Sequence, residues 1–286
     1  MSHIAVATAP NTVAESVPRR WQPSVAIRAS YGLHAACAAT ALLMPETWPW
    51  ALGLAGANQG VLAGAGMMPR SRMLGANLTR LSAAATRRRE VALTFDDGPD
   101  PDATPRVLDR LDASLAKATF FVVGTQARRH PGLVREIVRR GHAVENHSFL
   151  HSMHFPWYGP RRLEQDISAA QAAIADACGH APIFFRAPMG FRTPLLEPVL
   201  ARLGLHLASW TRRGFDTVER DPSVVAARLS RDLAAGDILL MHDGVAILGR
   251  SRPASTDALD RLLTRIAEHN LVPVTLRSAC CHAGTP

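Results

Sequence analysis

Cysteine is scarce in this chain of 286 residues, and its few copies form no recognisable framework. They stand at positions 37, 178, 280 and 281. Their spacing matches no zinc-binding pattern, and two adjacent cysteines are poorly placed to bridge each other. The sequence therefore predicts no disulfide-stapled fold and favours a reducing compartment.

Lysine is almost absent, so the chain carries its positive charge on arginine. Lys117 is the only lysine, although lysine and arginine together outnumber aspartate and glutamate by 32 to 24. Such a basic balance is compatible with nucleic acid, anionic lipid or a phosphorylated substrate as a partner. The arginines are spread over predicted helices and their junctions without interleaved aromatic residues. This distribution argues against nucleic acid, and we expect no nucleic-acid partner.

Charge is missing altogether from most of two neighbouring segments near the N-terminus. After a polar tail at residues 1–28, an Ala- and Leu-rich segment runs to Pro45, and residues 48–68 carry no charge at all. A helix over residues 48–68 is about 31 Å long, close to the hydrocarbon thickness of a bilayer. We therefore expect residues 29–69 to form transmembrane anchor helices arranged as a hairpin. A signal peptide, or a pair of buried helices in a soluble protein, are the alternatives.

Small and aromatic residues in these two segments agree with a membrane hairpin. Gly56, Gly60 and Gly64 repeat every four positions and fall on one helix face, where we expect the first helix to approach closely. Trp48 and Trp50 stand where interfacial anchors are expected. Membrane lipid is therefore a predicted partner.

Basic residues flank the predicted hairpin on both sides. Arginines stand at positions 19, 20 and 28 before the first segment and at 70, 72 and 80 after the second, whereas the loop at 45–47 has none. The positive-inside rule then places both ends of the hairpin, and the domain that follows, on the cytoplasmic side of the inner membrane. A single span with a domain facing the periplasm is the alternative.

A basic linker at residues 70–90 leads to a region that alternates strand-like and helix-like patterns, and residues 278–286 form a C-terminal tail. Strands are predicted at 91–95, 118–123, 142–145, 182–185, 205–210, 237–241 and 271–275. Helices are predicted near 104–115, 131–140, 161–177, 195–203, 222–235 and 255–269. The alternation predicts parallel βαβ units, and seven strands in this order suit a barrel.

Acidic and imidazole side chains stand where two of these strands end. The run TFDDGP at 94–99 places two carboxylates after a buried strand, and HSFLH at 147–151 holds two histidines four positions apart. On a helical turn, that spacing would put both rings on one face. One carboxylate and two imidazoles form a common metal-ligand set that leaves a coordination position open for water.

Two further strand ends carry related motifs, FFRAPMG at 184–190 and DILLMHDG at 237–244. Together with the first two motifs, in this order, they resemble the NodB-homology polysaccharide deacetylases, which form carbohydrate esterase family 4. A fourth family motif departs from its pattern: its best counterpart, residues 213–217, keeps Asp216 but has Arg213 for the first Asp and Thr217 for the Trp. The resemblance implies an α/β fold, the distorted (β/α)7 barrel of this family, over residues 91–277.

The resemblance also implies a role for each motif residue. Asp97, His147 and His151 would hold one divalent metal ion, with zinc the expected one. Asp96 would be the general base, Arg186 its ion-pair partner, and His242 the general acid, tuned by Asp216. The remaining implied residues would bind substrate: the Met189 backbone N–H and Gly190 at the oxyanion, Leu240 around the acetyl methyl, and Trp210 along the groove wall.

The resemblance implies a metal-dependent hydrolase that removes N-acetyl groups from an amino-sugar glycan or a lipid-linked saccharide. Removal of an O-acetyl or N-formyl group on the same scaffold is one alternative, and a non-catalytic glycan-binding protein is another. Asp243 is interpreted as a turn residue. His154 is either a spare metal ligand or, as we prefer, a loop histidine. The aromatic cluster at 155–158 would either face a sugar ring or lipid or close the end of the barrel.

Overall fold

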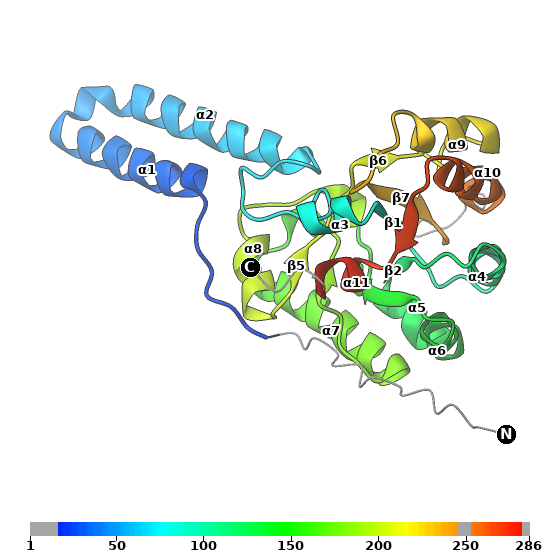
Figure 1. The fold of residues 1–286 in the computed structure, drawn as a ribbon. Coiled ribbons are helices and arrows are strands. Elements are labelled where there is room, and N and C mark those ends of the chain that lie inside the picture. The colour runs from blue at the N-terminus through cyan, green and yellow to red at the C-terminus, as the bar shows by residue number, and fades with distance from the viewer. Residues whose placement is uncertain (1–16, 245–252, 282–286) are drawn as a thin grey trace, which may run out of the picture.

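A single parallel sheet forms the centre of the molecule, as seen in a computed structural model that describes residues 17–244 and 253–281 (Figure 1). Its strand order is β5-β4-β3-β2-β1-β7-β6, and β8 pairs with the beginning of β1. The strands are β1 Glu90–Asp96, β2 Thr119–Val122, β3 Ala143–Asn146, β4 Phe184–Phe185, β5 His206–Leu207, β6 Arg212–Arg213, β7 Ile238–His242 and β8 Val272–Val274. All seven predicted strands are present, and every pairing between strands is parallel.

Strand β6 was not predicted, because it consists of two arginines and has no apolar pattern. The sheet forms there because Arg212 pairs with Leu239 and Arg213 with Leu240 in the register of β7. The Arg212 guanidinium also forms an ion pair with Asp237, with Nε 2.6 Å from Oδ2. A long-range pairing of this kind overrides local strand propensity.

Helices fill the connections between the strands, as predicted. The predicted ones correspond to α4 Ala103–Ala113, α6 Pro131–Arg139, α7 Pro160–Cys178, α8 Leu196–Arg202, α9 Pro222–Ser230 and α10 Ser255–Glu268. Helix α9 begins with Pro222 after its N-cap Asp221, whose side chain accepts a hydrogen bond from the Ser223 N–H. The short helices α3 Ala83–Arg87, α5 Gly124–Arg129 and α11 Leu276–Cys281 were not predicted, because each is too short to show a period.

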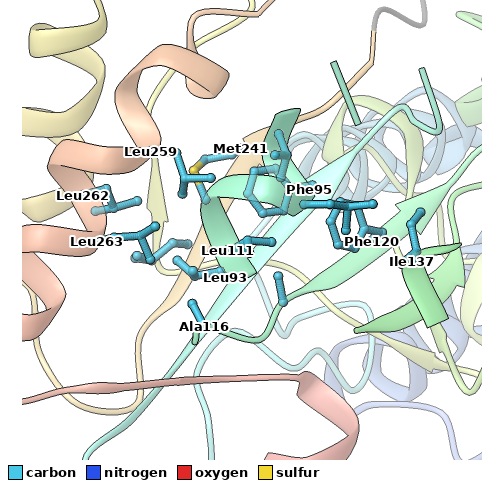
Figure 2. Packing of buried hydrophobic residues seen from close by; sticks show 14 of the residues in the cluster. Leu93, Phe95, Leu111, Ala116, Phe120, Ile137, Met241, Leu259, Leu262 and Leu263 are labelled. Carbon is cyan, nitrogen blue, oxygen red and sulfur yellow. The ribbon is translucent and has the colours of Figure 1, made fainter. Parts of the chain in front are cut away.

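The main hydrophobic core lies between β1, β2, β7 and the helices that cover them (Figure 2). Phe95 and Phe120 on adjacent strands stack with their ring centroids 5.2 Å apart. Apolar side chains of α10 pack against the same layer from the other side, among them Leu259 and Leu262. This packing fixes β1 and β7 side by side, and their carboxyl ends carry the site described below.

The sheet curves as a barrel does, but it does not close through paired strands between β5 and β6 in the part of the chain that the structure describes. A bridge from Leu78 to Ala208 covers the edge at this point, and the Leu78 N–H donates to Leu207. Residues before the predicted barrel therefore contribute to its wall. The predicted seven-stranded barrel is in this respect an open, eight-stranded parallel sheet.

A helical hairpin extends from the barrel at the N-terminal side of the chain (Figure 1). It consists of α1 Val25–Leu43, a 3-10 turn η1 Pro45–Thr47, and α2 Trp48–Met67. The helices were predicted, although α1 begins earlier than expected, after its N-cap Ser24. The transmembrane assignment is corrected: among the described residues, no helix combines the length and the apolar character that crossing a bilayer requires. Alanine and glycine supply much of both segments, and they add length with little hydrophobicity.

The two helices of the hairpin meet through polar side chains rather than through the glycine face. Asn58 Nδ2 donates to Ser30 Oγ at 2.7 Å, and Gln59 Nε2 lies 3.1 Å from His34 Nε2. A Cβ added at Gly56, Gly60 or Gly64 would meet nothing within 4 Å. The prediction of close helix approach along these glycines is therefore wrong. Polar residues within the apolar segments therefore join the helices, and Ile27 of α1 shares an apolar cluster with Leu62 and Ala65 of α2.

Candidate metal and acid–base site

Strand β1 ends in two buried carboxylates that point to different partners. Asp96 is the last residue of the strand, and Asp97 follows with a φ of 77°, so that the backbone turns sharply before the cis Gly98–Pro99 bond. Side chains alternate along a strand, and the turn separates the two carboxylates further. Asp96 faces Arg186, whereas Asp97 faces two histidines.

The structure brings the three predicted metal ligands together. Asp97 Oδ1 lies 3.4 Å from His147 Nε2 and 3.3 Å from His151 Nε2. Their potential ligand atoms all lie within 4.8 Å of one another. The orientation of His147 is fixed from behind, because its Nδ1 lies 2.9 Å from the Arg186 carbonyl. Such a contact directs the opposite nitrogen, Nε2, toward the shared centre.

The two histidines lie on a loop and not on the helical turn that their spacing suggested. Ser148 and His151 both have positive φ values, 65° and 47°, and the Ser148 hydroxyl accepts a hydrogen bond from the His151 N–H. The Asp166 carboxylate of α7 accepts hydrogen bonds from the N–H groups of Phe149 and Leu150. The loop is therefore held by side chains, and it still delivers both rings to Asp97.

The electrostatics of this cluster suit a cation. Burial lowers the pKa of His151 to about 4, assisted by the neighbouring His147, so this ring is neutral at pH 7. Burial opposes the charge on Asp97, but the nearby imidazoles, His147 first among them, hold the pKa of Asp97 well below its usual value. The buried Asp97 Oδ1 has no hydrogen-bond partner among the described residues. An orphaned carboxylate oxygen between two imidazoles fits a divalent metal ion.

Asp96 is held in one orientation by Arg186. The guanidinium Nη1 donates to Asp96 Oδ1 at 2.6 Å and to Thr94 Oγ1 at 2.8 Å. Two backbone carbonyls, of Ala208 and Ser209, accept its other hydrogen bonds, and its Cζ lies 4.0 Å from the centre of the Phe121 ring. Burial lowers the pKa of Arg186, and the Asp96 charge opposes that shift. This buried ion pair leaves the other Asp96 oxygen, Oδ2, on the side of the predicted metal ligands, 3.7 Å from His147 Nε2.

His242 stands opposite Asp96 on the neighbouring strand. The register of β1 and β7 pairs these two residues directly. Asp216 contacts His242 twice: its Oδ1 lies 2.9 Å from His242 Nδ1, and its Oδ2 accepts a hydrogen bond from the His242 N–H. Burial alone would lower the pKa of His242, but the Asp216 carboxylate, together with the charges of Asp97 and Asp96, outweighs it and raises the pKa to about 9. The altered fourth motif therefore still delivers its carboxylate to this histidine.

The predicted substrate-binding residues come from three segments of the chain. Met189 and Gly190 form the 3-10 turn η3 Pro188–Gly190, and both have positive φ values, 58° and 76°. A Cβ on Gly190 would come within 2.6 Å of the Trp210 ring, so only glycine fits there. Leu240 and Trp210 are buried in one cluster, and Trp210 also has the Arg186 and Arg213 guanidinium carbons each 5.8 Å from its ring centre.

Asp243 is the functional-site neighbour that the sequence reasoning missed. It was expected to be a turn residue, but it is buried, and its Oδ2 accepts a 2.6 Å hydrogen bond from Thr104. Its N–H donates to the Asp96 carbonyl, and a Cβ on Gly98 would collide with its carboxylate. Burial raises its pKa to about 7. A single Asp after a strand gives no signal for this role, since its contacts lie far away in sequence.

Two further predictions near the site concern His154 and the aromatic segment at 155–158. His154 is exposed and lies outside the cluster of potential ligands, as expected for a loop histidine. In the aromatic segment, Phe155 and Tyr158 are buried in a core that includes Phe185, whereas 85% of Trp157 is exposed. Of these three aromatic residues, Phe155 and Tyr158 therefore belong to a core and only Trp157 projects from it.

Comparison with known proteins decides the family. A family model described as polysaccharide deacetylase matches residues 83–208. A chitooligosaccharide deacetylase from Bradyrhizobium is 36% identical over 190 residues, which cover 66% of this chain and 85% of that protein. The chain belongs to the polysaccharide deacetylase family. As a member of that family it is an enzyme, a carbohydrate deacetylase of the hydrolase class.

Further relatives of this polysaccharide deacetylase support the same assignment. A peptidoglycan-N-acetylglucosamine deacetylase from Bacillus cereus is 31% identical, with 65% of this chain and 85% of that protein covered. A family 4 carbohydrate esterase from Streptomyces lividans, solved in complex with acetate, is similar in fold with a TM-score of 0.59 and 33% identity. That match covers 64% of this chain and 91% of the other. The hairpin lies outside the part of the deacetylase that the family model matches.

Proposed function

We propose that this enzyme is a metal-dependent N-deacetylase that hydrolyses the acetamido group of an amino sugar. The observation that carries the proposal is the placement of two proton-handling groups next to a metal-ligand cluster. Asp96 and His242 are paired across β1 and β7, and Asp97 with its two histidines lies beside them. Amide hydrolysis needs this combination: a base for water, an acid for the departing amine, and stabilisation of the oxyanion.

Asp97, His147 and His151 would hold the metal ion, and the orphaned Asp97 oxygen supports that assignment. When bound, a divalent ion such as zinc supplies a lowered pKa for water and a polarised carbonyl. The residues around it then have separate tasks. Asp96 accepts the proton of the attacking water, and Arg186 keeps the carboxylate oriented toward the cluster.

His242 would complete the reaction as the general acid. Because its pKa is raised to about 9, it is protonated at neutral pH and can donate to the amine nitrogen as the C–N bond breaks. The Met189 N–H would stabilise the oxyanion from the η3 turn, while the buried Leu240 would border the acetyl methyl and Trp210 the groove. Products of the reaction are acetate and a free amino sugar.

The names of the relatives guide the substrate proposal. They act on chitooligosaccharides and on the N-acetylglucosamine of peptidoglycan. We therefore propose an N-acetylglucosamine-containing oligosaccharide, free or carried by a lipid, as the substrate. A glycolipid and membrane lipid remain proposed partners, and location at the inner membrane remains a proposal that cell fractionation and C-terminal reporter fusions would test.

The decisive experiment supplies the purified full chain, loaded with zinc, with N-acetylated chitooligosaccharides, and measures acetate and free amine together. We expect both products in equal amounts from the wild type and neither from Asp96→Asn, which retains its metal. Two further substrates test the alternatives: release of acetate without amine from an O-acetylated chitooligosaccharide would instead indicate an O-deacetylase, and release of formate from an N-formylated one an N-deformylase. Saccharide binding without any product would indicate a non-catalytic glycan-binding protein.

A further inference from the structure

The segment of residues 66–77, which joins α2 to the barrel, packs directly on the turn that carries Met189. This segment precedes both the predicted barrel and the start of the family match at residue 83. The Arg192 N–H, two residues after the η3 turn, donates to the Gly66 carbonyl at 3.1 Å. The contact is so close that a Cβ on Gly66 would meet the Arg192 carbonyl oxygen. The end of α2 and the end of the turn therefore hold each other.

The Arg192 side chain makes a second connection between the turn and the segment. It is buried, and its Nη2 donates to the Ser71 carbonyl, with Nη1 3.5 Å from the Ala76 carbonyl. Asn77 links two positions of the same loop, because its Nδ2 donates to the carbonyls of Pro69 and Ser71 at 2.8 and 3.0 Å. These hydrogen bonds shape residues 69–77 into a compact loop against the barrel.

Pro69 adds a further contact of the segment with the turn, at Gly190. A Cβ on Gly190 would come within 2.9 Å of the Pro69 ring, and within 2.6 Å of Trp210 on the other side. The Pro69 carbonyl also accepts a 2.6 Å hydrogen bond from Ser209, next to Trp210. Gly190 is therefore enclosed between Pro69 and a wall of the proposed substrate groove.

The turn needs such support because its backbone is strained. Met189 has a φ of 58°, a conformation that costs a non-glycine residue free energy and persists only where its surroundings impose it. The hydrogen bonds within the turn, from Gly190 to Ala187 and from Phe191 to Pro188, are the short-range bonds of a single turn. The contacts that add long-range constraint come from the 66–77 segment and from Trp210.

We propose that the 66–77 segment is a working part of the active site and that it positions the Met189 N–H for the oxyanion. Arg192 and Asn77 are the positioning residues through which it acts. The inference rests on the proposed deacetylation, in which Met189 has that role. It extends the catalytic unit toward the N-terminus, so that the barrel with its motifs is incomplete without residues that precede the family domain.

Hydrogen exchange of the full chain tests the packing without relying on activity. We compare Arg192→Gln and Asn77→Ala with the wild type, and we use Arg72→Gln as a matched control, since Arg72 lies in the same segment but is exposed. We expect amides of residues 190–192 to exchange on the order of tenfold faster in the first two variants, through local opening, and unchanged in the control. Unchanged protection of the turn in both variants would overturn the inference.

Steady-state kinetics of the same zinc-loaded variants test the catalytic consequence. Loss of a transition-state donor lowers kcat and leaves KM nearly constant, so we expect kcat to fall on the order of 10- to 100-fold in Arg192→Gln at full metal content. Arg192→Lys, which keeps a donor near Ser71, should recover part of kcat. A kcat that falls only in proportion to folded or metal-loaded protein would contradict the positioning role. A wild type without activity but with the expected exchange changes would refute the deacetylase proposal instead and leave the packing claim standing.

Discussion

The two sides of the proposed active site contain sequence motifs that match the family pattern to different degrees, yet on both sides the predicted residues lie in contact. On the metal side, Asp97, His147 and His151 come from two intact motifs and lie together as expected. On the acid side, Asp216 comes from a motif that has lost its first Asp and its Trp, and it still contacts His242 through both oxygens. The contact between Asp216 and His242 therefore depends on where the chain places the carboxylate, and it forms without the other residues of that motif.

The two sides also shift the pKa of a histidine in opposite directions. His151 is buried beside another histidine, and its pKa falls to about 4, which suits a neutral ligand. His242 is equally sheltered, but the nearby carboxylates, Asp216 first among them, outweigh the cost of burial and raise its pKa to about 9, which suits a proton donor. Environments that separate the pKa values of like groups are a recognised way to divide acid and base roles.

Removing a histidine from the metal side should have the largest effect. In His151→Ala we expect activity to fall to background and most of the bound zinc to be lost, because two remaining ligands bind the ion poorly. Metal analysis after dialysis, together with the acetate assay, measures both. His154→Ala is the matched control, since that histidine is exposed and lies outside the cluster. Stoichiometric zinc in a variant lacking all three ligands would refute the assignment.

Removing the histidine of the acid side should cost activity without costing metal. We expect kcat of His242→Ala to fall about 10²- to 10⁴-fold, the usual contribution of a general acid, with zinc content close to that of the wild type. The contrast with His151→Ala is what separates the two sides. Full activity in His242→Ala would remove this residue from the mechanism.

Neutralising Asp216 should change the pH dependence more than the maximum rate. In Asp216→Asn the pKa of His242 loses the carboxylate that raises it, so the protonated form persists only to lower pH. We expect the alkaline limb of the kcat profile to move to lower pH, with a decrease of about tenfold at pH 8. An alkaline limb that stays in place would mean that another group controls it.

The contact between Asp216 and His242 also predicts a small effect on the stability of the metal-free protein. A histidine whose folded pKa of about 9 exceeds its ordinary value of 6.5 stabilises the fold below pH 6.5, and that stability is lost as the pH rises toward 9. We expect Tm of the chelated wild type to decrease over this window, and Tm of Asp216→Asn to decrease less. Parallel Tm curves for the two proteins would contradict the pairing.

Asp243 should show the smallest effect, and here the titrating group is a buried carboxyl instead of a histidine. Its folded pKa of about 7 exceeds the ordinary value of 3.8, so the buried carboxyl favours folding while protonated and becomes unfavourable as the pH rises from about 4 to 7. In Asp243→Asn this contribution is absent. As the pH rises across that window, we therefore expect Tm of the wild type to decrease relative to Tm of the variant. A constant difference would show that Asp243 does not titrate there.

The strands and helices of the barrel were predictable because buried runs and helical periods are local. The residues of the metal cluster followed from motifs at strand ends, although the loop conformation around Ser148 did not. The double-arginine strand β6, the buried Asp243 and the contacts of Arg192 were invisible, since each depends on partners far away in sequence. The hairpin shows the opposite error: its missing charge correctly indicated helices, but not a span.

The pairing of Asp96 with His242 across two hydrogen-bonded strands has a consequence for how this enzyme can change. Adjacent strands are held about 4.8 Å apart by their backbone ladder, whatever the side chains are. The spacing of the two backbone positions is therefore a property of the sheet, while Arg186 and Asp216 orient the side chains of the proposed proton acceptor and donor. New substrate preferences can be grafted onto the rim of this barrel without redesigning the proton transfers at its centre.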